Sequence, residues 1–309
     1  EPSYNAVEQS VPVEVGELLK LVQEVTKERS ELLENISKKP SEALLTIIRV
    51  GTSAGGNRPK AVIALNDQTD EIRSGQVDAP KGFDYWVLKF DGVTDSSLAD
   101  PAGYGRIEYA YHKMAVATGI EMTECRLFEE NGRAHFMTRR FDRLKNGGKQ
   151  HMQTLSAMAH FDFYDPGAYS YEQAFQVMRE LRLPYKDAEQ QFRRMVFNIV
   201  ARNQDDHTKN ISFLMNKSGE WRLSPAYDVI YSYNPSGRWT SMHQMSINGK
   251  RDDFTRDDLN AVGREMNIKS SNRIIDEVIE AVSIWPGFAK NAGVQNSQVE
   301  AIRRVHRLL

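Results

Sequence analysis

"VFNIVARNQDDHTKNISFL", residues 196–214, decides the fold because it places a dense polar loop between two apolar runs. Upstream, Phe192, Met195, Ile199 and Val200 recur at helical spacing and predict a helix that leads into the loop. Downstream, the apolar runs "ISFLMN" and "LSPAYDVI" flank the turn "NKSGE" and predict two short strands. The loop therefore joins the end of a helix to the start of a strand.

The polar side chains of this loop have the spacing of a phosphoryl-transfer site. Four residues separate Asp205 from Asn210, and the two-stranded turn would bring Asp228 back beside them. Carboxylate and amide oxygens suit Mg²⁺. In the protein-kinase pattern, an Asp followed by four residues and an Asn supplies a base and a metal ligand, and a later Asp holds the metal. Asp206 has no role in this pattern.

The kinase pattern also requires a glycine-rich turn, a strand lysine and a helical glutamate, and they occur upstream in that order. "GTSAGGNRP" lies between the strand-like runs "LLTIIRV" and "KAVIALN". In "YWVLKFD" the residues alternate, so that Lys89 shares a face with Tyr85 and Val87, opposite Trp86, Leu88 and Phe90. "GRIEYAYHKMAVATGI" predicts a helix that carries Glu108.

The remaining segments indicate two lobes. Residues 14–37 predict a helix, and "TECRLFEE" and "RAHFMTRRFD" predict a hairpin across Asn131-Gly132. Helices are expected in "YEQAFQVMRELRL" and in three segments of the last third, which follow a Gly/Asn/Ser-rich stretch. We therefore expect an α+β, bilobal protein-kinase-like fold, with a β-rich small lobe at 1–140 and a mainly helical large lobe, interrupted by two short strands, at 141–309.

Composition excludes several classes of protein. The chain has 309 residues, 40 basic and 42 acidic, and its formal net charge of -2 gives no global attraction to nucleic acid or anionic lipid. A single cysteine, Cys125, excludes an internal disulfide. There is no apolar run of membrane-spanning length, and the start "EPSYNAVEQS" has no secretion-signal pattern. We expect a cytoplasmic protein without a membrane association.

Each piece of the pattern also has an ordinary structural interpretation. A polar loop after a helix often serves capping and turns, a glycine turn supplies positive φ, and a strand lysine often extends from an edge to solvent. Glu108 alone could be a solvated helix residue. His207 could be a metal ligand, a structural histidine or, as we favour, a nucleotide contact, because no second His or Cys lies at zinc-ligand spacing. The order of the pieces favours the kinase interpretation.

Six segments in order resemble the HipA family of bacterial Ser/Thr kinases: "SAGGNRPKA", "YWVLKF", "MTRRFDR", "VFNIVARNQDDHTKNISFL", "LSPAYDVIYSYNP" and "INGKRDDFTRDDL". The resemblance runs from about residue 45 to the C-terminus. It implies that Asp205 is the catalytic base, that Asn210 and Asp228 are Mg²⁺ ligands and that Lys89 binds the ATP phosphates. The other nucleotide contacts that it implies are Gly55, Gly56, Asn57, Arg58, Pro59, Lys60, Arg139, Arg140, Phe141, His207, Thr208, Lys209 and Tyr227.

The resemblance further implies a regulated toxin. Ser53 matches an autophosphorylated loop serine, with Thr52 as the neighbouring acceptor, and the added charge would oppose the approach of ATP phosphates. The implied partner is a small helix-turn-helix antitoxin of the HipB type, with DNA contacted only through it, and the implied substrate class is aminoacyl-tRNA synthetases. Two other functions stay open: a small-molecule kinase of the same fold, and a kinase-like corepressor that acts through a DNA-binding antitoxin.

Overall fold

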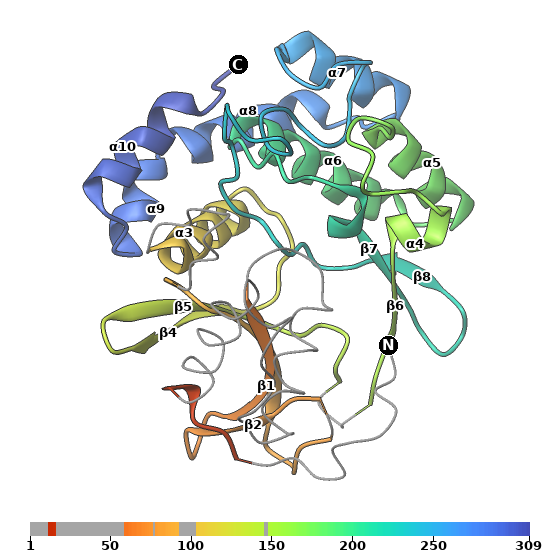
Figure 1. Cartoon of the computed structure of the whole chain (residues 1–309). Helices are drawn as coiled ribbons and strands as arrows, with labels where there is room; N and C mark the ends of the chain where they lie inside the picture. Colours follow the sequence, from red (N-terminus) through yellow and green to blue (C-terminus); the bar gives the residue numbers. More distant parts are fainter. Residues whose placement is uncertain (1–11, 17–58, 77, 93–102, 145–147) are drawn as a thin grey trace, which may run out of the picture. The chain divides into compact units, whose positions relative to one another are not determined.

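The computed structural model describes residues 12–16, 59–76, 78–92, 103–144 and 148–309, and its contacts divide the chain into two compact units (Figure 1). The β-rich unit takes Glu1–Tyr109 and Glu124–Lys149, and the helical unit takes Ala110–Thr123 and Gln150–Leu309. This division differs from the predicted boundary at residue 140. Residues 141–149 go with the β-rich unit, where the Arg143 guanidinium lies 6.0 Å from the centre of the Tyr85 ring. Residues 110–123 go with the helical unit, where the Ala226 N–H donates to the Glu121 carbonyl.

The β-rich unit is built on a five-stranded antiparallel sheet in the order β2-β1-β3-β5-β4. The strands are β1 (Lys60–Asn66), β2 (Glu71–Ser74), β3 (Asp84–Lys89), β4 (Cys125–Glu130) and β5 (Arg133–Arg139). β4 and β5 meet at Asn131 and Gly132, whose φ values of 46° and 80° are those of a two-residue hairpin turn. The predicted strands over "KAVIALN" and "YWVLKFD" and the predicted hairpin are therefore confirmed.

One face of this sheet is packed by an apolar cluster. Its members alternate along β1 and β3, as a pleated strand requires. They are Val15, Ala61, Ile63, Leu65, Ile72, Trp86, Leu88, Phe90 and Met137. Because successive side chains point to opposite faces, burying Trp86 and Leu88 in this cluster sends Lys89 to the other face, as the sequence predicts.

The helical unit contains most of the helices and a small sheet, β6-β7-β8, made of β6 (His151–Thr154), β7 (Ser212–Met215) and β8 (Trp221–Leu223). Strand β6 was not expected. Its sequence, "HMQT", is short and polar, and it forms a strand because it pairs with β7. β7 and β8 confirm the two predicted strands on either side of "NKSGE".

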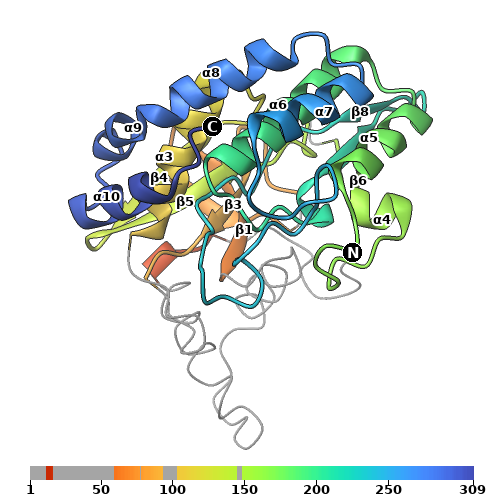
Figure 2. The ribbon, with the colours of Figure 1, turned by 90° about the horizontal axis from the view of Figure 1, so that it is seen from above.

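Helices α6 (Tyr185–Val200) and α8 (Ser271–Ser283) are amphipathic and pack side by side (Figure 2). Four helices follow residue 255, where three segments were expected, because Pro286 starts a separate helix just after α8 ends. The helices are α3 (Tyr104–Ala117), α4 (Leu155–Ala159), α5 (Tyr171–Glu180), α6 (Tyr185–Val200), α7 (Arg256–Glu265), α8 (Ser271–Ser283), α9 (Trp285–Asn291) and α10 (Asn296–Val305), with a 3₁₀ turn, η1, at Thr208–Asn210.

Two further expectations concern the start of the chain and the membrane. The predicted helix at 14–37 and the predicted strand "LLTIIRV" lie outside the described residues, apart from 14–16. Among the residues that the structure describes, no helix combines the length and the apolar character needed to cross a membrane.

Gly105 is required where α3 begins. A Cβ added there would lie 2.0 Å from the Ala134 carbonyl oxygen of β5, and a backbone atom cannot move aside cheaply. We expect Gly105→Ala to destabilise the protein by about 1–3 kcal/mol, as overpacking does. The control is Gly287→Ala in α9, where a Cβ meets nothing within 4 Å and alanine favours the helix. Urea unfolding of both variants checks this, and equal stability would contradict the close packing at Gly105.

Candidate active site

The predicted catalytic loop follows α6 and is held by its backbone. Arg202 leaves the helix with a φ of 58°, and His207, the last residue before η1, is extended. The N–H of Asp205 donates to Ser232 Oγ at 3.0 Å, and the carbonyl of Asp205 accepts from Asn210 Nδ2 at 2.8 Å. Both polar groups of the Asp205 peptide backbone are thus bonded, while its side chain is 44% exposed. A fixed backbone with an accessible carboxylate suits a base that must meet a substrate hydroxyl.

Asn210 and Asp228 line the same small cavity, of about 20 Å³, in the helical unit. Tyr227, also at this cavity, donates its hydroxyl to the Lys209 carbonyl at 2.6 Å and so ties the two segments together. Asp228 has a φ of 55°, a conformation that few residues other than Gly, Asn and Asp adopt and that is common at functional sites. The sequence predicts that the two-stranded turn brings Asp228 back beside the loop, and the structure places it there.

The chemistry of this pair fits Mg²⁺ rather than a metal held by the protein alone. The described residues contain no group of three or more His, Cys, Asp or Glu side chains placed to hold a metal ion. Mg²⁺ needs only one or two protein oxygens, with waters and phosphates completing its shell. Because Asn210 Nδ2 donates to Asp205, the oxygen of the amide is left as the ligand atom. Asn210 and Asp228 are therefore a suitable donor set for Mg²⁺ with ATP.

Asp206, the residue without a predicted role, is an anchor of this loop. Its side chain is buried and accepts hydrogen bonds of 2.8 Å from the Tyr171 hydroxyl, from His243 Nδ1 and from the Gln244 N–H. Burial alone raises the pKa of Asp206, but the adjacent His243 and these hydrogen bonds outweigh it and hold the pKa below its usual range. The carboxylate is therefore charged, and both of its oxygens accept hydrogen bonds from the protein.

Of the three residues between Asp206 and Asn210, His207 reaches the proposed base, because its Nε2 lies 3.8 Å from Asp205 Oδ1. His207 and Thr208 line a cavity with Phe163 and Tyr169, and Thr208 is 2% exposed. Lys209 Nζ lies 3.4 Å from the centre of the Phe163 ring. The predicted contacts of His207, Thr208 and Lys209 with nucleotide remain proposals.

In the β-rich unit, Lys89 forms a buried ion pair with Glu108 of α3. Lys89 Nζ lies 2.5 Å from Glu108 Oε1, and the two side chains are 10% and 2% exposed. Lys89 also lies over the Phe136 ring of β5, 5.7 Å from its centre. The strand lysine and helical glutamate that the kinase pattern requires are thus paired.

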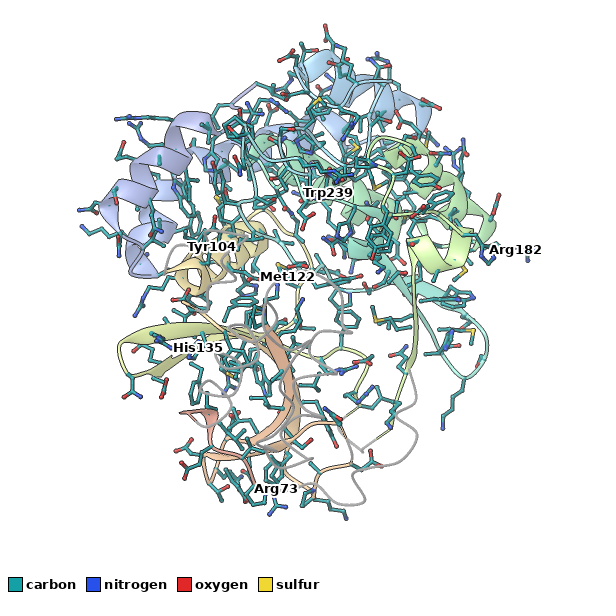
Figure 3. The ribbon with its side chains drawn as sticks, in the orientation of Figure 1. Arg73, Tyr104, Met122, His135, Arg182 and Trp239 are labelled. Carbon is teal, nitrogen blue, oxygen red and sulfur yellow. The ribbon has the colours of Figure 1, made fainter. Side chains whose placement is uncertain are left out.

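A buried aspartate aligns the helix that carries Glu108. Asp91, two residues after Lys89, accepts at 3.0 Å from the Gly103 N–H and at 3.3 Å from the Gly105 N–H, at the positively polarised start of α3. The Asp91 N–H in turn donates to Nδ1 of His135, which is labelled on β5 in Figure 3. The short link from Lys89 to Asp91 therefore fixes the start of α3, one turn before Glu108.

The predicted glycine-rich turn reaches the described residues at Pro59 and Lys60. Pro59 accepts a hydrogen bond of 3.1 Å from the Phe90 N–H, and Lys60 is paired directly with Lys89 across β1 and β3. Directly opposite residues share a face of a sheet, so both lysines lie on the face away from the apolar cluster. The other predicted residues of this turn, Ser53, Gly55, Gly56, Asn57 and Arg58, and Thr52 beside them, lie outside the described residues.

The predicted adenine-contacting connection, Arg139 to Phe141, follows the sheet. Arg139 pairs with Asp84, and Arg140 makes a two-point contact with Asp142 at 2.8 and 2.6 Å. The Arg140 N–H donates to the Tyr85 carbonyl, which extends the β3–β5 pairing by one residue. Both guanidinium groups are paired with carboxylates. The predicted contact of this segment with adenine remains a proposal.

Sequence patterns named the candidate site residues of both units but missed the residues that support them. Asp91, Ser232 and His243 were assigned no role. Each is an ordinary polar residue with no distinctive spacing to its partner. Only folding brings them to Asp205, Asp206 and the start of α3.

The Lys89–Glu108 pair leads to a stability prediction. Removing one charge of a buried pair leaves the other uncompensated, so we expect Glu108→Gln to cost about 3–5 kcal/mol. The double variant Lys89→Met/Glu108→Gln should cost less than the sum of the single changes. Arg106→Gln, a change on the same helix that breaks an exposed pair with Glu129 of β4, should cost less than about 1 kcal/mol. Urea unfolding measures all of these, and additive effects at Lys89 and Glu108 would contradict the buried pair.

Comparison with known proteins identifies the family of the chain. The HipA-like C-terminal domain family matches residues 52–285. A Sinorhizobium fredii protein (strain NBRC 101917 / NGR234), "Putative kinase Y4mE", is 25% identical over 153 residues, which cover 47% of this chain and 34% of that protein. The matched part thus spans about a third of the length of that curated relative.

Solved structures give the fold. A chain in the structure of the Shewanella oneidensis MR-1 toxin–antitoxin complex of HipA, HipB and operator DNA is similar with a TM-score of 0.66 and 17% identity, over 98% of this chain and 72% of that one. The Helicobacter pylori proinflammatory kinase CtkA is less similar, with a TM-score of 0.42 and 11% identity over 72% of this chain and 90% of that one, and supports no inference. The expected α+β, kinase-like fold is therefore confirmed, and the chain belongs to the HipA-like C-terminal domain family.

Proposed function

We propose that the protein is an ATP- and Mg²⁺-dependent kinase that phosphorylates serine or threonine hydroxyls. One observation carries this proposal: Asn210 bonds the backbone of Asp205 and shares a cavity with Asp228. A base, an amide oxygen and a second carboxylate are thus held by one loop and by the segment that follows β8. Phosphoryl transfer depends on such positioning and on charge neutralisation, and it needs no covalent enzyme intermediate.

Each residue has a distinct task in this proposal. Asp205 accepts the proton of the attacking hydroxyl, and Asn210 and Asp228 would hold Mg²⁺, which neutralises charge on the phosphates. Lys89, oriented by Glu108, binds ATP phosphates. Pro59 and Lys60 belong to the proposed phosphate-facing turn with Gly55–Arg58, and Arg139–Phe141, His207–Lys209 and Tyr227 complete the nucleotide contacts.

We also propose that the kinase is the toxin of a toxin–antitoxin pair. Family membership supports this, and a solved structure of similar fold contains HipA with HipB and operator DNA. The partner would be a small helix-turn-helix antitoxin of the HipB type, and DNA would be contacted through it. An aminoacyl-tRNA synthetase is the substrate class that we propose to test first.

A corepressor that acts only by binding such an antitoxin is the second candidate. The same solved complex, which contains operator DNA, favours considering it. The paired Lys89 and Glu108 and the Asp205 loop argue for catalysis, because a purely binding protein does not need them. Repression of the operator that survives Asp205→Asn would show that binding is a separate function.

The central prediction concerns phosphate transfer. We expect γ-phosphate transfer from ATP by the wild type with Mg²⁺, its loss on chelation, and a rate about 10²–10⁴-fold lower in Asp205→Asn, because a general base contributes about that much. Transfer of labelled phosphate to protein acceptors, including the enzyme itself, measures this.

The control for that change is Asp276→Asn, the same substitution at an exposed position on α8, which should leave the rate unchanged. Equal transfer by the wild type and Asp205→Asn would remove the proposed mechanism. Transfer to a small molecule but to no protein acceptor would favour a small-molecule kinase.

Self-phosphorylation gives a separate prediction. After incubation with ATP and Mg²⁺, we expect one added phosphate at Ser53, followed by loss of activity, because its charge of about -1.5 to -2 would repel the phosphates of ATP. Intact mass and peptide mapping should show no phosphate at this position in Ser53→Ala or in Asp205→Asn. Phosphate at Thr52 instead would move the site by one residue, and phosphate at neither would reject self-regulation here.

A further inference from the structure

A continuous series of hydrogen bonds connects the backbone of Asp205 to the carboxylate of Asp206 through the interior of the helical unit. The Asp205 N–H donates to Ser232 Oγ at 3.0 Å, and Ser232 donates to Asn203 Oδ1 at 2.9 Å. Asn203 Nδ2 donates to Asn198 Oδ1 at 2.9 Å, and Asn198 Nδ2 donates to the Tyr171 hydroxyl at 3.0 Å. Tyr171 then donates to Asp206 Oδ2 at 2.8 Å.

Every bond in this series donates in the same direction, toward Asp206. An aligned series polarises each of its members, and inside a protein that effect is stronger than in water. The series ends at a negative charge, the acceptor that strengthens such bonds most. The series therefore links the charged carboxylate of Asp206 to the peptide N–H of Asp205.

The Asp206 carboxylate is itself held from the other side. His243 Nδ1 and the Gln244 N–H both lie 2.8 Å from its oxygens, and the His243 side chain is 0% exposed. Since a carboxylate only accepts, His243 carries its proton on Nδ1. An amide at position 206 would keep the shape but turn an N–H₂ group toward donors. The hydrogen-bond donors around position 206 therefore favour a charged carboxylate over an amide.

We infer that Asp206 is the positioning residue of the proposed kinase, holding the backbone of Asp205 at the acceptor hydroxyl through Ser232, Asn203, Asn198 and Tyr171. Asp206 lines the cavity that Asn210 and Asp228 share, but both of its oxygens accept from protein donors, so it touches no substrate in this scheme. It acts on the step in which Asp205 takes the hydroxyl proton, so its loss should lower kcat and leave the KM for ATP unchanged. The inference rests on the proposed kinase function.

Ser232 gives the cleanest test, because its change is small. We expect Ser232→Ala to lower kcat about tenfold, which corresponds to the loss of one buried hydrogen bond, about 1.4 kcal/mol. Ser232→Thr keeps the hydroxyl and should restore most of the rate. Asp206→Asn should lower kcat further, and the double variant Asp206→Asn/Ser232→Ala should be no slower than Asp206→Asn, because both break one series.

The matched control is Asp187→Asn. Asp187 is another buried carboxylate of the helical unit, bonded to Arg222 and to the Leu223 N–H, and no bond of the series involves it. It should lower thermal stability as Asp206→Asn does but leave kcat unchanged. If Asp187→Asn lowers kcat as much as Asp206→Asn, the role of Asp206 is only structural and the inference fails.

A second readout does not depend on activity. Amide hydrogen exchange in peptides covering residues 203–210 should be about tenfold faster in Ser232→Ala and in Asp206→Asn than in the wild type or Asp187→Asn. Unchanged exchange overturns the inference whatever the kinetics. Two outcomes keep the failure of the proposed function distinct from the failure of the inference. The proposed function fails if the wild type and Asp205→Asn transfer phosphate equally. The inference alone fails if Asp205→Asn is inactive while Ser232→Ala and Asp206→Asn keep the wild-type kcat.

Discussion

The buried charge of Asp206 is the constraint on which the candidate active site of the helical unit depends. An ionised carboxylate inside a protein is costly unless every lone pair has a partner. Tyr171, His243 and Gln244 come from α5 and from the segment before α7, so satisfying Asp206 brings both segments to the loop after α6. The loop that carries Asp205 and Asn210 is thereby fixed by the same bonds that make the charge tolerable.

The β-rich unit contains a similar arrangement. Asp91 is buried, and its carboxylate is satisfied by the first N–H groups of α3. This bonding fixes where the helix starts, and Glu108, about one turn later, then meets Lys89. In both units a buried aspartate that does not itself belong to the kinase pattern aligns the residues that do. Burying such a group rigidifies its neighbours because any displacement would expose an unpaired charge.

Much of this protein follows from local pattern. Alternation along 84–91 determined which face Lys89 occupies, and Asn131-Gly132 determined a hairpin because both residues accept positive φ. Apolar spacing located α5 and α6. The kinase-like spacing of Asp205, Asn210 and Asp228 predicted that these residues lie together, and Asn210 and Asp228 do line one cavity. Strand β6 was missed because "HMQT" forms a strand only through its pairing with β7.

The sequence by itself determined the elements and the candidate reactive groups, since periodicity and spacing are properties of neighbouring residues. Tertiary structure alone decided what holds those groups. Ser232 and Asp205 are 27 positions apart, and Asp206 and His243 are 37 apart, so no local rule connects them. Their bonds depend on how helices and loops pack, and for that reason Asp206, unremarkable in the sequence, emerged as an anchor only in the fold.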